Sequence, residues 1–83
     1  MPDTEALHAA QLLYGLSERM QVERGRATSR KVRSGLDYCI TMIEEAAAHT
    51  ALGYMSLDEA DAIADAGELS LRRFRAMTGD NQS

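Results

Sequence analysis

Apolar residues recur at alternating steps of three and four along most of this chain of 83 residues. This spacing places residues on one face of an α-helix, whereas a strand would alternate every two residues. The only proline is at position 2, and β-branched residues do not occur in runs. The sequence therefore predicts an all-α fold.

Three segments carry this spacing. The first stripe consists of Ala6, Ala9, Leu13, Leu16 and Met20, widened by Leu12. The second consists of Val32, Leu36, Cys39, Ile43 and Ala46, flanked by Ile40, Ala47 and Ala51. The third places Ala60, Ile63, Ala66, Phe74 and Met77 on or near its inner face. We therefore expect helices over about residues 4–25, 29–52 and 57–78, in a single domain over 1–79 with a polar tail at 80–83.

The clearest helix boundary lies between the second and third segments. Gly53 can supply the left-handed residue that ends a helix. Ser56 and Glu59 have the spacing of a capping box, in which the serine hydroxyl accepts from the Glu59 amide while the carboxylate reaches back. These residues predict a short connection at 53–55.

The boundaries of the first segment are less constrained. Asp3 or Thr4 can cap its start. Gly25 and the possible caps Thr28 and Ser29 are compatible with a turn but do not require one. Either two helices or one long helix over 4–52 is therefore consistent with the sequence.

Short connections near 25–29 and 53–55 predict an antiparallel arrangement of three helices, a helical hairpin plus an N-terminal helix. The core of such a domain is thin, because much of its apolar content is alanine and the chain has one Phe and no Trp. A domain of this size is only marginally stable on its own. We therefore expect a homodimer to complete the fold.

The charges sort toward the two ends of this arrangement. The net charge is −4, yet the fold would bring all nine basic residues to one end. Acidic residues favour helix N-termini and basic residues favour C-termini. The first and third segments obey this rule, but the second begins with Arg30, Lys31 and Arg33. Either neighbouring Glu18 and Glu23 compensate these cations, or the end presents them to an acidic protein surface or a phosphate.

A partner-binding site at this end would comprise eight residues. They are Arg24, Arg26, Arg30, Lys31, Arg33, Arg72, Arg73 and Arg75.

No residue pattern predicts a catalytic, cofactor-binding or metal site. Glu5 with His8, and Glu45 with His49, have spacings that could hold a metal, but only with further ligands from a larger bundle. We interpret both histidines as surface residues. Cys39 is interpreted as a small core residue, because no histidine is expected near it. The sequence thus gives no reason to expect an enzyme.

The segment IADAGELSLRRFRAM, Ile63–Met77, resembles the helix-turn-helix of TetR-type and AraC-type repressors. In that resemblance Phe74 is a core residue, and Arg72, Arg73 and Arg75 project from a recognition helix toward DNA. The glycine at 67 stands one place early and Glu68 occupies the turn position. The same segment is also compatible with one continuous helix in which Gly67 is a close-packing residue.

The leading functional hypothesis is a small cytoplasmic protein-interaction module, such as a regulator, inhibitor, adaptor or chaperone. Cys39 is the only cysteine, and the N-terminus lacks the pattern of a secretory signal. No apolar run is long enough to span a membrane, so we expect no membrane association. The module would dimerise and bind a protein with an acidic surface through a helix face or its arginine-rich end. The alternative is a DNA-binding transcriptional regulator with a divergent helix-turn-helix at 57–77.

Overall fold

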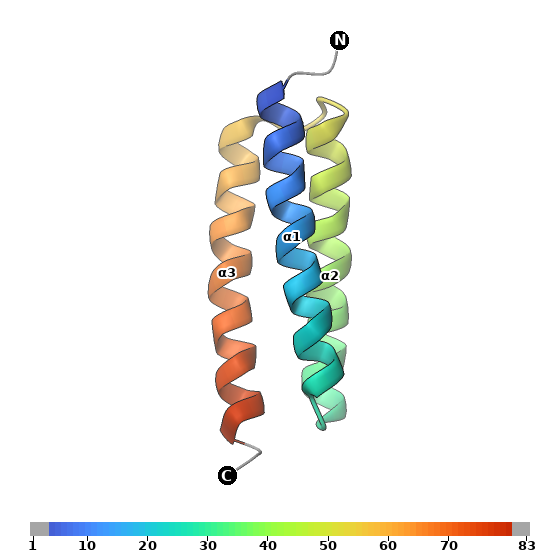
Figure 1. The fold of residues 1–83 in the computed structure, drawn as a ribbon, viewed down its shortest axis with the longest axis vertical. Coiled ribbons are helices and arrows are strands. Elements are labelled where there is room, and N and C mark those ends of the chain that lie inside the picture. The colour runs from blue at the N-terminus through green and yellow to red at the C-terminus, as the bar shows by residue number, and fades with distance from the viewer. Residues whose placement is uncertain (1–3, 81–83) are drawn as a thin grey trace.

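The chain forms a three-helix bundle in a computed structural model that describes residues 4–80, with the side chains of residues 4–78. The helices are α1 (Thr4–Arg26), α2 (Arg30–Ala51) and α3 (Leu57–Asp80). They lie side by side, and the chain reverses direction at each connection (Figure 1). Residues 4–80 contain no strand, which confirms the all-α prediction.

The first connection separates α1 from α2, so a single helix over 4–52 does not form. Ser29 is the N-cap of α2: its φ and ψ are −79° and 130°, and its hydroxyl oxygen accepts from the Val32 amide at 3.4 Å. Ala27 in the connection is buried in the core. Its amide donates to the Glu23 carbonyl at 3.1 Å. Ser29 is therefore the cap that the sequence offered among its alternatives. For the first helix the sequence offered Asp3 or Thr4 as the cap, and Asp3 lies outside the described residues.

The second connection has the local structure that its residues predicted. Gly53 has a φ of +82°. The Tyr54 amide donates to the His49 carbonyl at 2.8 Å, and the Gly53 amide donates to the Thr50 carbonyl at 3.1 Å, which together form a Schellman motif. The Glu59 amide donates to the Ser56 hydroxyl at 3.1 Å. The Glu59 carboxylate accepts from that same hydroxyl at 3.2 Å.

The core runs the length of the bundle. Its largest fully buried apolar side chains are Leu13, Leu16, Met20, Leu36 and Leu71. Three residues that we expected on the inner faces of their helices lie outward instead: Leu12 is 58% exposed, Met77 is 47% exposed and Ala66 is exposed. The inner stripe of α3 is instead Ala60, Ala64, Gly67, Leu71, Phe74 and Thr78.

Gly67 does not break α3, which is continuous from Leu57 to Asp80. A Cβ atom on Gly67 would lie 2.6 Å from Cδ2 of Leu16 and 3.0 Å from Cδ1 of Ile43. Gly67 therefore lies where all three helices meet, and the absence of a side chain lets them pack closely there. The helix-turn-helix geometry considered for 57–77 is wrong, because a recognition helix requires a turn that this segment does not make.

Candidate functional site

Basic residues gather at one end of the bundle, which we call the basic end. It is formed by the end of α1, the start of α2 and the end of α3, which lie together at the bottom of Figure 1. The nine residues of the basic end are Arg19, Arg24, Arg26, Arg30, Lys31, Arg33, Arg72, Arg73 and Arg75.

The three arginines of α1 are engaged in ion pairs within the bundle. Arg19 binds Glu68 of α3 through both of its terminal guanidinium nitrogens. Arg24 binds Asp37 of α2 through Nε. Arg26 lies beside Glu23 of its own helix, with 3.6 Å between Nη1 and Oε2. These cations therefore hold α1 to its neighbours or stabilise its last turn.

Arg24 and Arg26 were both included in the partner-binding site inferred from the sequence. Because they are paired within the fold, six residues of that site remain available.

These six form no ion pair among the side chains described for residues 4–78, and all are exposed. They are Arg30, Lys31, Arg33, Arg72, Arg73 and Arg75. Three of them crowd the first turn of α2, which contains no acidic residue. The positive end of the helix dipole disfavours cations there.

The compensation considered for the start of α2 is not found. Glu23 is 3% exposed and pairs with Arg26. Glu18 is exposed and makes no ion pair within the described part of the chain. The unfavourable charges at the start of α2 therefore remain unneutralised by either carboxylate.

The unpaired cations lie on more than one side of the bundle at the basic end. Arg33 precedes Asp37 by one helical turn and so lies on the side of α2 that faces α1. Arg72 and Arg75 follow Glu68 by one and two turns and lie on the side of α3 that faces α1. Lys31 lies on the remaining side, where it lines a hollow of about 460 Å³ between α2 and α3 with Gly35, Phe74 and Met77. Guanidinium groups bind carboxylates and phosphates in a bidentate manner. Because the unpaired cations lie on different sides of the bundle, they favour contact with an extended anionic surface over binding of one small anion.

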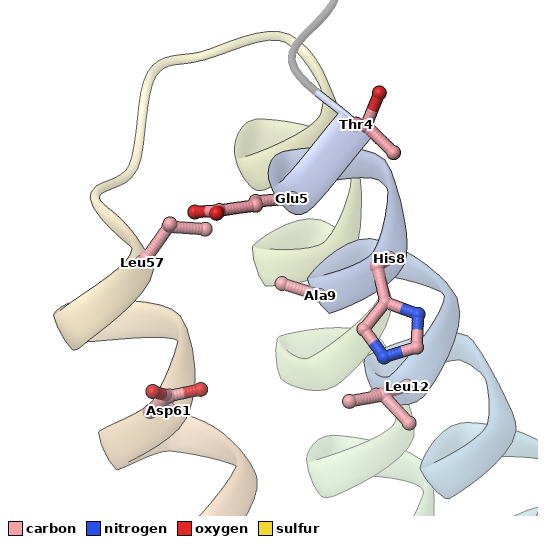
Figure 2. Close-up of a pocket in the computed structure, with 7 residues that line it drawn as sticks. All are labelled: Thr4, Glu5, His8, Ala9, Leu12, Leu57 and Asp61. Atoms are coloured by element: carbon pink, nitrogen blue, oxygen red, sulfur yellow. The ribbon is translucent and has the colours of Figure 1, made fainter.

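The opposite end carries acidic residues and a hollow of about 390 Å³ between α1 and α3 (Figure 2). Figure 2 shows Glu5 extending toward Leu57 of α3 and His8 pointing away from Glu5. At the neighbouring connection, the His49 ring packs edge-on against Tyr54, with 6.3 Å between ring centroids. Within the described residues, no group of three or more His, Cys, Asp or Glu side chains is placed to hold a metal ion.

Cys39 lies half-buried between α2 and α3 and packs against the core. Burial raises the pKa of its thiol above the ordinary value of 9.0. The thiol is therefore protonated at neutral pH and is a weak nucleophile.

Comparison with protein-family models, curated proteins and solved structures found no match. None of the described helices combines the length and apolar character that a membrane-spanning segment needs.

Proposed function

We propose that this chain is a small protein-interaction module that binds a partner protein through the basic end. The observation that carries this proposal is the set of six exposed cations with no ion pair among the described side chains. Three of these cations occupy a helix start where the fold gains nothing from their charge. Their placement is explained if they recognise a partner.

The partner we propose is a protein with an acidic surface. A chain of net charge −4 repels a polyanion at long range, and its acidic end would face away from any bound duplex. A folded acidic surface has a lower charge density than a duplex, so the repulsion is weaker, and its carboxylates can bind arginine in a bidentate manner. The function would be that of a regulator, inhibitor, adaptor or chaperone.

Two further parts of the hypothesis belong with this proposal. We propose that the chain is cytoplasmic, and that it acts as a homodimer because its alanine-rich core is thin.

The test is affinity capture from an extract of the source organism, with partners quantified by mass spectrometry. The triple arginine variant carries Arg33→Gln, Arg72→Gln and Arg75→Gln, which remove three positive charges from the side of the basic end that faces α1. The control variant carries Thr4→Glu, Gln11→Glu and Ala62→Glu, which add three negative charges at exposed positions away from that end. Both variants therefore have the same net charge.

We expect the acidic proteins that the wild type captures to be lost with the triple arginine variant and kept with the control variant. Equal recovery with all three proteins would exclude Arg33, Arg72 and Arg75 from partner binding. Recovery of nucleic acid in place of protein, with the same dependence on these arginines, would favour the DNA-binding alternative.

A further inference from the structure

The seam between α2 and α3 leaves apolar side chains incompletely covered. Tyr38 is 69% exposed and Met42 is 49% exposed on α2. They border a hollow of about 220 Å³ whose α3 side includes Ile63, Ala66 and Ser70. The second hollow of the seam, beside Lys31, exposes Met77. We call this strip the α2/α3 face.

Two helical stripes of the same spacing make up this face. The α2 stripe is Lys31, Gly35, Tyr38, Met42, Glu45 and His49, and the α3 stripe is Glu59, Ile63, Ala66, Ser70, Arg73 and Met77. Steps of three and four keep each set on one side of its helix. The middle of both stripes contains no charged residue.

The charges of the two stripes lie at opposite ends of the face. The chain reverses direction between α2 and α3, so the start of α2 lies beside the end of α3 (Figure 1). Lys31 and Arg73 therefore lie toward the basic end, while Glu45 and Glu59 lie toward the other end. Both acidic residues are exposed. The face is thus apolar at its centre, positive toward one end and negative toward the other.

We propose that a second copy of this chain covers the α2/α3 face, with the two bundles side by side and pointing in opposite directions. This inference rests on the homodimer proposed above and specifies its interface and orientation. A two-fold axis across the middle of the face brings the positive part of each copy to the negative part of the other. The parallel arrangement would place like charges together at both ends, which is unfavourable.

The size of the face suits a dimer. The chain has an accessible surface of 5595 Å², and the α2/α3 face is one of the three long sides of the bundle. A standard specific interface buries about 800 Å² on each partner, which is less than a third of that surface. Exposed aromatic and methionine side chains at the centre of a charged rim are the composition that such interfaces favour.

The other two sides of the bundle fit a second copy less well. Between α1 and α2, the ion pair of Arg24 with Asp37 and the hydrogen bond from Gln21 to Glu44 cross the surface. Between α1 and α3, the pair of Arg19 with Glu68 does the same. Burying these polar groups would cost desolvation free energy. The middle of the α2/α3 face has no such bridge among the described residues.

The proposed dimer has a consequence for partner binding. It covers Lys31 and Arg73 but leaves Arg33, Arg72 and Arg75 exposed, because those side chains lie toward α1. The two copies point in opposite directions, so one such cluster lies at each end of the dimer. A single dimer could then bind two acidic surfaces.

The first test measures self-association by light scattering and sedimentation. We expect the wild type to have twice the mass of one chain. Met42→Glu and Ala66→Glu each place a carboxylate in the middle of the interface, and each should raise the dimer dissociation constant at least about tenfold. Leu12→Glu changes another exposed apolar residue, on the α1 and α3 side, and should leave the dissociation constant unchanged. Circular dichroism checks that each variant stays helical.

The second test measures orientation. A spin label on Thr28→Cys, in a Cys39→Ser background, marks the basic end of each copy. Pulsed electron resonance should report a separation on the order of the length of α3, about 36 Å for its 24 residues. A much shorter separation would show a parallel dimer and overturn the proposal.

A monomeric wild type, or an equal effect of Leu12→Glu and Met42→Glu, would also overturn the proposal. None of these variants changes a cation. Failure to dimerise through this face and failure to bind an acidic partner are therefore separate results.

Discussion

Gly67 of α3 packs directly against Leu16 of α1, at a spacing that leaves no room for a side chain on Gly67. A Cβ atom there would lie 2.6 Å from Cδ2 of Leu16. Leu16 is itself 1% exposed and belongs to the core. The glycine therefore lets the helices meet closely in the middle of the bundle.

Replacing Gly67 with alanine should destabilise the protein. An alanine in a helix interior normally gains about 1 kcal/mol over glycine, but overlap with a packed core costs roughly 1–3 kcal/mol. We expect the free energy of unfolding to fall by about 1 kcal/mol net, measured by urea denaturation. Gly15→Ala is the control, because a Cβ atom there would have no atom of a neighbouring helix within 4 Å. It should stabilise the protein, and an equal gain from both variants would contradict the proposed packing.

Ser56→Ala should lower the free energy of unfolding by about 1 kcal/mol. The hydroxyl of Ser56 accepts from the Glu59 amide at 3.1 Å and satisfies one of the free amides at the start of α3. Thermal unfolding followed by circular dichroism measures the change. Ser34→Ala removes an exposed serine within α2 and should be neutral or slightly stabilising. Equal melting temperatures for the two variants would show that the cap contributes nothing.

Glu23→Gln should also destabilise the bundle, by on the order of 1 kcal/mol. The carboxylate is almost fully buried and lies 3.6 Å from Nη1 of Arg26. Glu18→Gln makes the same charge change at an exposed position of α1 and should have little effect. Denaturation at low and high salt distinguishes the two, because salt screens a buried charge much less than an exposed one and the loss caused by Glu23→Gln should persist at high salt. A loss that is the same for both variants would show that only net charge matters.

Cys39 predicts how stability changes in alkaline solution. Burial raises the pKa of its thiol in the folded chain, so folding favours the protonated form. The resulting stabilisation is fully present below the ordinary pKa of 9.0 and is lost as the pH rises through the raised value. At pH 9, iodoacetamide should alkylate the native chain more slowly than the urea-unfolded chain. Cys39→Ala should remove this contribution to the alkaline loss of stability, and an unchanged pH dependence would contradict it.

Local signals in the sequence predicted the ends of the helices. The Ser56 cap and the glycine termination at Gly53 act through bonds between residues within one turn, so their chemistry can be read without the fold. The choice between one and two helices before Leu52 was not decided by local signals. It depends on packing, since Ala27 enters the core only after α2 folds back on α1.

The phase of α3 was harder to predict, because many of its inner residues are small. Ala64 and Gly67 give a weak apolar signal, so Ala66 and Met77 were placed inward and Leu71 was overlooked. Thr78 was overlooked as well, although it is 3% exposed. Its hydroxyl donates to the Phe74 carbonyl at 3.0 Å, as the buried Thr50 hydroxyl does to Ala46 at 2.7 Å. A threonine that binds its own helix in this way can be buried without another partner.

The sequence predicted the end of the bundle at which the basic residues lie, but not which of them are paired within the fold. The sequence placed all basic residues at one end, which requires only the order of the helices. The pairing of Arg24 with Asp37 and of Arg26 with the buried Glu23 depends on the rotation of α1, which composition does not determine.

The central claim is that the unpaired cations of the basic end bind an acidic protein surface. The most direct measurement is a titration of the ¹⁵N-labelled chain with a glutamate-rich peptide, followed by ¹H–¹⁵N correlation spectra. We predict that the largest shift changes fall on residues 30–33 and 72–75, and that they decrease as salt is raised. Changes centred elsewhere in the bundle, or no change at low salt, would contradict the claim.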